Sequence, residues 1–192
     1  MAKILVFAGS TRSESFNRKL ATVAAAAAEQ TGAVVTHIEL ADYPMPLFNQ
    51  DLEASEGMPD SARQFKQQLI DHDGFIIASP EYNSAFSPLM KNVIDWASRS
   101  EVEGEPPLAA YRGKTALLLA ASPGALGGLR GLVHLRMVLS NIGVYVIPDQ
   151  LAVSSAFNAF EDDEPRLADA GQQQKLERIV WQLVDTTDKL HS

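Results

Sequence analysis

Short apolar runs alternate along this chain with longer segments in which apolar residues recur every three or four positions. The runs have the length and continuous apolar character of buried strands, and the strands they predict are 3–8, 33–40, 74–79, 114–121 and 144–147. The longer segments have the period of an amphipathic helix, and the helices they predict are 17–31, 60–72, 87–98, 127–141 and 168–190. Strand and helix therefore alternate in the order typical of βαβ units.

Strands that are apolar on both faces belong to a parallel sheet that helices cover on each side. The chain has 192 residues, the size of one domain, so we expect residues 1–192 to form a single unit. The economical α/β solution is a flavodoxin-like doubly wound three-layer sandwich with a five-stranded parallel sheet in the order 2-1-3-4-5. Ligands of such sheets bind beyond the carboxyl ends of the strands, so the loops after the first, third and fourth predicted strands are the candidate sites.

Two stretches lack a clear period. The stretch 41–59 contains three prolines and is predicted to be a long irregular loop. The stretch 148–165 is mixed and acidic, and its simplest interpretation is a solvated loop. The sequence assigns no role to residues 149–166.

The first candidate loop reads "GSTRSESFN" (residues 9–17) and leads directly into an alanine-rich helix. Hydroxyl groups, the N–H groups of a helix start and the guanidinium of Arg12 can all donate hydrogen bonds to phosphate oxygens. The alternative is that Ser15 or Asn17 only caps the helix, but capping needs a single residue and leaves Ser10 and Arg12 unexplained. Neither G-x-G-x-x-G nor a P-loop motif follows the first strand, which favours a monophosphate cofactor.

The second loop, "SPEYNSAFSP" (79–88), places Glu81, Tyr82 and Asn83 at the carboxyl end of a strand. Its prolines stiffen it, so it can present backbone amides and a flat side chain to a planar ring. An ordinary turn with Ser87 as N-cap and Pro88 at the first helical position explains the end of the loop. That interpretation does not account for residues 81–83.

The third loop, "ASPGALGGLR" (121–130), is rich in glycine at positions 124, 127 and 128. Glycine lets the backbone approach a ligand closely, although glycine-rich turns are common in any protein. The position of the loop strengthens the functional interpretation, because three unusual loops meet at one edge of the sheet.

Composition and charge narrow the possible chemistry. The net charge of −8 and the lack of a basic cluster argue against nucleic-acid binding. With no cysteine, disulfides and thiolate metal sites are excluded, and the four histidines lack the spacing of a zinc site. No apolar run approaches the ~20 residues needed to cross a bilayer, and the N-terminus does not have the pattern of a secretion signal. We therefore expect a cytoplasmic protein with no membrane or nucleic-acid partner and no metal.

Three segments resemble the NADPH-dependent FMN reductase family, which includes bacterial chromate, quinone and azo-dye reductases. They are "GSTRSESFNRKLA", "SPEYNSAFSPLMKNVIDWASR" and "SPGALGGLRGLVHLRMVLSNIG"; the first two are specific and the third less so. The chain departs from the family pattern at Ala85, where serine is frequent, and at Met90, where leucine is usual.

The resemblance implies FMN as cofactor, with NADPH or NADH as electron donor. It places Ser10, Arg12, Ser15 and Asn17 around the phosphate, and Pro80, Glu81, Tyr82 and Asn83 along the isoalloxazine. Ser122, Gly124 and Gly127 would close the other side of the ring. Thr11 and Ser13 occupy positions that the family motif leaves variable.

The expected function is an FMN-dependent NAD(P)H oxidoreductase that passes two electrons to a quinone, azo compound, flavin or chromate. Because the flavin performs the redox chemistry, we assign no catalytic acid or base. Tyr82 and Asn83 are expected to flank the ring, with simple packing as the alternative for Tyr82. A flavodoxin-type electron carrier fits the acidic charge, but flavodoxins have a T-x-T-G-x-T phosphate loop with no place for Arg12. A receiver-like domain is set aside because "FAGS" offers no carboxylate for Mg²⁺.

The resemblance also implies a homodimer or homotetramer formed through helices 87–99 and 127–141. The second of these helices is apolar around more of its circumference than one core face requires, which supports association. Its apolar residues are Leu129, Leu132, Val133, Leu135, Val138 and Leu139. Trp96 lies near the end of the first helix and is expected close to the site, with a core or surface position as the alternative.

Overall fold

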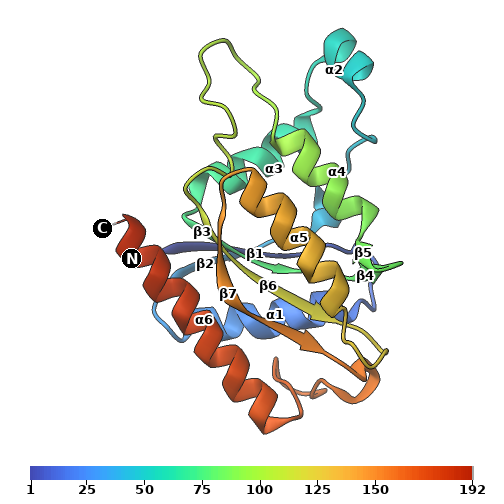
Figure 1. The fold of residues 1–192 in the computed structure, drawn as a ribbon, viewed down its shortest axis with the longest axis vertical. Coiled ribbons are helices and arrows are strands. Elements are labelled where there is room, and N and C mark those ends of the chain that lie inside the picture. The colour runs from blue at the N-terminus through green and yellow to red at the C-terminus, as the bar shows by residue number, and fades with distance from the viewer. Residues whose placement is uncertain (192) are drawn as a thin grey trace.

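The computed structural model describes residues 1–191, which form a central parallel sheet with helices on both faces (Figure 1). The sheet has the order β2-β1-β3-β6-β7, so the predicted flavodoxin-like topology is confirmed. Its strands are β1 (Lys3–Ala8), β2 (Val34–His37), β3 (Gly74–Ala78), β6 (Thr115–Ala121) and β7 (Tyr145–Val153). The principal helices are α1 (Phe16–Glu29), α3 (Asp60–Asp71), α4 (Pro88–Ala97), α5 (Leu129–Asn141) and α6 (Ala170–His191).

The central strands are buried on both faces, as their continuous apolar sequences predict. In β1, Ile4 and Val6 pack with α1 and α6, whereas Leu5 and Phe7 pack with α3, α4 and α5. Each such side chain contributes on the order of 1.5–3 kcal/mol through burial. The N-terminus and the carboxyl end of α6 lie at the end of the sheet opposite the short strands β4 (Glu81–Tyr82) and β5 (Ala85–Phe86) (Figure 1). The carboxyl ends of the parallel strands therefore lie at the edge that carries the candidate loops.

The stretch 41–59 is more ordered than predicted. It contains the 3-10 helix η1 (Leu40–Asp42) at its start and the α-helix α2 (Gln50–Glu56), so the prediction of an irregular loop was wrong for its second half. The Asn49 side chain caps α2 by accepting a hydrogen bond from the Asp51 N–H at 2.8 Å. Gly57 ends the helix with φ of 77°. The residues that begin and end this helix, Asn49 and Gly57, are typical helix-boundary residues, but the three prolines of the stretch led to the prediction of a loop.

Trp96 belongs to the core, so the core alternative for this residue is confirmed. Its side chain is fully buried, and its Nε1–H donates to the Pro46 carbonyl at 2.8 Å. Its ring meets the Phe48 ring edge-on, with 5.0 Å between centroids. Trp96 therefore fastens the segment before α2 to α4.

β7 is longer than predicted. The predicted strand ended at residue 147, but the observed strand continues through Pro148 to Val153, with an irregular register opposite Ala116 and Leu118. Proline is compatible with this position because β7 lies at the edge of the sheet. The Arg136 guanidinium on α5 donates to the carbonyls of Val146 (3.2 Å) and Ile147 (2.7 Å), satisfying backbone groups at the irregularity.

The remaining part of the 148–165 stretch is a 3-10 helix, η2 (Ala156–Asn158), followed by a tight turn. An isolated bridge between Phe160 and Leu167 closes this turn, and the acidic residues 161–164 at its tip are exposed. The solvated interpretation is thus confirmed only for the tip. Among residues 1–191, no helix has both the length and the apolar character needed to cross a membrane.

Candidate functional site

The loop between β1 and α1 begins at a glycine that is enclosed by neighbouring loops. The Gly9 N–H donates to the Ala78 carbonyl (2.9 Å), and its own carbonyl accepts from the Ser87 hydroxyl (2.7 Å). A Cβ at position 9 would lie 2.7 Å from Cε of Met90. Ser87 also accepts from the Met90 N–H, so the predicted cap of α4 is present, followed by Pro88 at the helix start. Ser87 thus links the first loop to α4.

Ser15 occupies the N-cap position of α1, yet its side chain makes no capping hydrogen bond. The residue is only 3% exposed. Ser10 accepts a hydrogen bond from the Arg12 N–H at 3.3 Å, which shapes the loop between them. Capping therefore does not explain Ser15, and its hydroxyl remains available to a ligand at the positive end of the α1 dipole.

Arg12 is exposed and forms no ion pair with any of residues 1–191. Its Cζ atom lies 5.8 Å from the centroid of the Phe16 ring, the first residue of α1. A guanidinium beside a helix start, without an internal carboxylate, presents unused positive charge to an incoming anion.

Asn17 connects the first loop to the end of β6. Its Nδ2–H donates to the Ala121 carbonyl, and its Oδ1 accepts from the Ala121 N–H, both at 2.9 Å. The second N–H of the buried Asn17 side-chain amide is not used in these bonds. Contact between Asn17 and a phosphate therefore stays a prediction, and only this N–H could make it. The main observed role of Asn17 is to fix α1 relative to β6.

Arg18 supports the first loop from behind, which the sequence did not reveal. Its Nη1 donates to the carbonyls of Arg12 (3.4 Å) and Ser13 (3.3 Å), and its Nε pairs with the Glu39 carboxylate at 2.8 Å. Arg18 lies in the first turn of α1. From the sequence, an arginine that supports a neighbouring loop cannot be told apart from one that is exposed to solvent.

The second loop is a hairpin rather than an irregular turn. β4 and β5 pair antiparallel, and the two residues between them, Asn83 and Ser84, have φ of 51° and 69°. Two positive φ values in a two-residue connection identify a type I′ turn. Asn83 lies exposed at its tip and does not line the cavity described below, so its expected contact with the ring has no support here.

The Glu81 side chain binds the start of α5. Its carboxylate accepts from the N–H groups of Arg130 (3.0 Å) and Gly131 (3.2 Å) and from Nε of Arg130 (2.8 Å). Burial acts to raise the pKa of Glu81, but the hydrogen bonds from Arg130 and Gly131 outweigh it, and the pKa is lowered. The carboxylate is thus committed to holding the hairpin on α5, and only other atoms of Glu81 remain for a ligand.

The glycines of the third loop serve packing more than ligand approach. Gly127 has φ of 61°, and a Cβ there would lie 2.7 Å from the backbone carbon of Val153 in β7. Gly124 accommodates a Cβ without such a clash, and its N–H donates to the Ser122 hydroxyl at 3.2 Å. Neither glycine lines the cavity, whereas Ser122 does. The backbone at Gly127 does approach a neighbour closely, but that neighbour is strand β7 and not the cavity in which a ligand was expected.

A cavity of about 630 Å³ joins the three loops, within the size range of small-molecule sites. It brings together most of the residues expected from the sequence, namely Ser10, Arg12, Ser15, Asn17, Pro80, Glu81, Tyr82 and Ser122. Tyr82 is 55% exposed, so its ring is available rather than packed. The cavity is also lined by residues that the sequence did not single out, including Phe16, Lys19 and Phe157.

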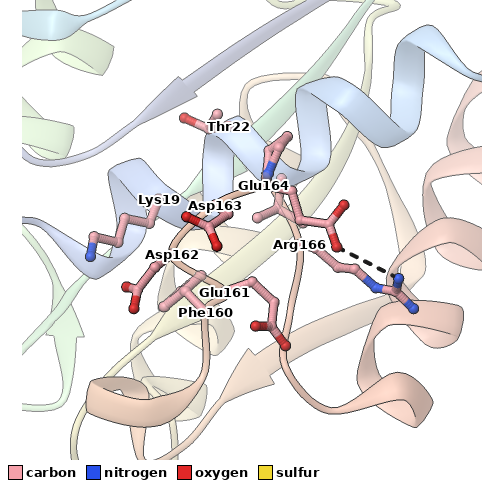
Figure 2. A pocket seen from close by; sticks show the side chains of 10 residues that line it. Lys19, Thr22, Phe160, Glu161, Asp162, Asp163, Glu164 and Arg166 are labelled. Atoms are coloured by element: carbon pink, nitrogen blue, oxygen red, sulfur yellow. Dashed lines mark ion pairs between the residues drawn. The ribbon is translucent and has the colours of Figure 1, made fainter.

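A second cavity of about 400 Å³ lies between α1 and the 160–166 turn (Figure 2). Lys19 and Thr22 of α1 form one side, and the acidic residues of the turn form the other. Glu164 pairs loosely with Arg166 at 3.9 Å. Lys19 lines both cavities, so the two adjoin. Within residues 1–191, no group of three or more His, Asp or Glu side chains is arranged to hold a metal ion.

Comparison with known proteins gives consistent results. The model of the NADPH-dependent FMN reductase family matches residues 2–158. The NAD(P)H-dependent FMN reductase of Pseudomonas aeruginosa is 39% identical over 171 residues, covering 87% of this chain and 85% of that protein. The 2-hydroxy-1,4-benzoquinone reductase of a Burkholderia species is 32% identical over 170 residues, covering 84% and 87%. The solved structure of a flavoenzyme NAD(P)H:(acceptor) oxidoreductase from Paracoccus denitrificans superposes with a TM-score of 0.83 at 27% identity, covering 98% of each chain.

Proposed function

The chain belongs to the NADPH-dependent FMN reductase family, and we propose that it passes two electrons from NAD(P)H through FMN to a quinone or another small electrophilic acceptor. Membership establishes an oxidoreductase that uses FMN and a nicotinamide donor. The acceptor is the proposed part. A quinone is favoured because one relative is named a benzoquinone reductase and another, 34% identical over 137 residues, a quinone reductase. Azo compounds, free flavin and chromate are further candidates.

The donor groups around the first loop suit the phosphate of FMN. The observation that carries the proposal is that one cavity is lined both by Ser15, whose hydroxyl makes no capping hydrogen bond, and by Arg12, whose guanidinium forms no ion pair within residues 1–191. Ser10 and the first N–H groups of α1 add neutral donors, and a phosphate at a helix start gains from the dipole. A cap requires one of these groups, whereas a phosphate dianion can use most of them.

Bound FMN would supply the redox chemistry that links the nicotinamide donor to the acceptor. The protein contributes binding and position. Ser10, Arg12 and Ser15 would orient the phosphate. Pro80 and Tyr82 line the same cavity near the β4–β5 hairpin, which Glu81 holds on α5, and they would contact the ring or a flat substrate. Asn83, Gly124 and Gly127 act from outside the cavity, by forming the turns that shape its wall.

A flavodoxin-type electron carrier is the alternative, and the net charge of −8 favours it. A carrier would stabilise a one-electron form of its flavin and oxidise NAD(P)H poorly. The test is therefore a titration of the FMN-loaded protein with NADPH and NADH under anaerobic conditions. Bleaching of the flavin absorbance in one two-electron step, followed by reoxidation with a quinone, is expected. A stable radical signal with no NAD(P)H oxidation would exclude the reductase proposal.

Self-association through α4 and α5 is the second part of the proposal. Leu129, Val133 and Met137 are exposed and recur every four residues along α5, while Leu132, Leu135 and Leu139 are buried against the sheet. A groove of about 410 Å³ between α4 and α5 continues this apolar surface. We expect a homodimer or homotetramer whose mass, measured by light scattering, falls to that of one chain in Val133→Glu. Trp181→Glu, which changes an exposed aromatic on α6, is the matched control.

A further inference from the structure

Phe157 is an exposed phenyl group held on an anchored backbone. Its side chain is 77% exposed and lines the cavity of the proposed flavin site. The preceding residue, Ala156, is fully buried, and its N–H donates to the Ser122 carbonyl at 3.2 Å. Ser155 has φ of 51°, a strained value for serine that the surrounding contacts maintain. The short helix η2 therefore holds the backbone of Phe157 in place while its side chain stays exposed.

The neighbours of Phe157 place it at the phosphate end of the cavity. Its ring meets the Phe16 ring edge-on, with 5.2 Å between centroids. The Phe16 ring is stacked on Phe160 at 6.3 Å, and the Arg12 guanidinium lies beside it. The aromatic cluster of Phe16, Phe157 and Phe160 thus borders the loop that we assign to the FMN phosphate, and Phe157 is its most exposed member.

Lys19 supplies a cation next to this cluster. It is exposed, lines both cavities, and forms no ion pair or side-chain hydrogen bond with any of residues 1–191. Figure 2 shows its side chain extending along α1, away from Thr22. If Arg12 is occupied by the FMN phosphate, Lys19 supplies a second positive charge for an anion in the first cavity, whereas the acidic residues 161–164 line the second cavity and disfavour an anion there.

We propose that Phe157 and Lys19 form the subsite for the adenosine diphosphate half of the nicotinamide dinucleotide. The adenine would stack on the exposed face of Phe157, and the Lys19 ammonium would pair with the pyrophosphate. This inference rests on the proposed function, because a dinucleotide donor is the ligand that must enter beside bound FMN. It carries a second flat ring and two further phosphates, whereas a quinone acceptor has no phosphate for Lys19. Stacking of a base on an aromatic side chain is favourable for any base.

The direct test is calorimetric titration of the FMN-loaded protein with adenosine 5′-diphosphate. We expect Phe157→Ala to weaken binding by about tenfold, the effect typical of losing one stacked base. Phe157→Trp, which keeps a flat ring, should retain most of the affinity, and Lys19→Gln should weaken it in a salt-dependent way. Trp181→Ala removes another exposed aromatic side chain, on α6, and should leave the affinity unchanged.

Steady-state kinetics separate the adenosine half from the nicotinamide half. In Phe157→Ala, the rise in KM for NADH should exceed the rise for reduced nicotinamide mononucleotide by about tenfold, because the mononucleotide lacks the adenylate. Equal rises for the two donors, an unchanged affinity for adenosine diphosphate, or an FMN dissociation constant that rises in parallel would each overturn the subsite. Failure of the wild-type protein to retain FMN would instead overturn the proposed function.

Discussion

Replacing Arg12 by alanine tests the assignment of the first loop most directly. The guanidinium forms no ion pair with residues 1–191, so its removal leaves no carboxylate without a partner and should not unfold the protein. Its contact with the Phe16 ring, at 5.8 Å, is worth only about 0.5–1 kcal/mol at an exposed site. A hydrogen bond to a charged group is worth roughly 1.5–3 kcal/mol. We therefore expect the FMN dissociation constant to rise by roughly 10- to 150-fold.

The assay is quenching of FMN fluorescence on titration with protein, at low and at near-physiological salt, because screening weakens an exposed contact. Arg12→Lys keeps the charge but loses the planar donor pair, so its affinity should lie between wild type and alanine. Arg178→Ala is the control, because it removes an arginine of α6 that does not line the cavity and breaks an exposed ion pair with Asp149 of β7. An FMN affinity that is unchanged in Arg12→Ala, or equally reduced in Arg178→Ala, would refute the role given to the loop.

Further predictions concern the other parts of the site. Ser15→Ala should weaken FMN binding. It should not lower the stability of the FMN-free protein by the ~1 kcal/mol that loss of a helix cap normally costs, because Ser15 makes no capping bond; thermal melting without and with FMN measures the two effects. Ser84→Gly should stabilise the protein by roughly 0.5–1 kcal/mol in urea denaturation, since glycine tolerates the φ of 69°; a loss of stability would argue against the I′ turn. Gly127→Ala should destabilise by several kcal/mol or prevent folding, because its Cβ would meet the β7 backbone at 2.7 Å; near-normal melting would contradict this. The pKa of Glu81 is lowered in the folded protein, so its carboxylate stabilises the fold above pH 4.5, and this stabilisation is lost as the pH falls through the folded pKa. Glu81→Gln should therefore lower the free energy of unfolding by roughly 1 kcal/mol at neutral pH and by progressively less in acid. A difference in stability that does not change with pH would refute the ion pair with Arg130.

Local sequence pattern predicted the parts of the fold that depend on burial. Strands such as β1 and β3 are apolar throughout because helices cover both faces, and that signal does not depend on distant residues. β7 was truncated in the prediction because Pro148 and the polar residues after it mimic a loop, although an edge strand tolerates them. The hairpin was missed because Asn-Ser is a weaker turn signal than Asn-Gly. These errors fall where tertiary position overrides local preference.

The candidate site was predictable as a set of loops but not as a set of contacts. Topology alone brings the loops after β1, β3 and β6 to one edge, so most of the expected residues line one cavity. What the sequence could not show is which polar groups are already used by the protein. Glu81 and Asn17 are committed to Arg130 and Ala121, whereas Ser15 is not. Phe157 was missed because an exposed phenyl in an unpatterned segment resembles any surface residue.

The committed groups explain why the uncommitted ones can bind tightly. Ser87 joins the first loop to α4, Asn17 joins it to β6, and Glu81 joins the hairpin to α5, each across more than forty positions of sequence. These bonds fix the three loops relative to one another through groups that are not needed for a ligand. A ligand that enters would then lose little free energy in ordering the backbone, and the remaining donor residues, Ser10, Arg12 and Ser15, already line the cavity. We therefore propose that the polar residues of the first loop have two functions: Asn17 holds the site together, and its neighbours Ser10, Arg12 and Ser15 bind the phosphate.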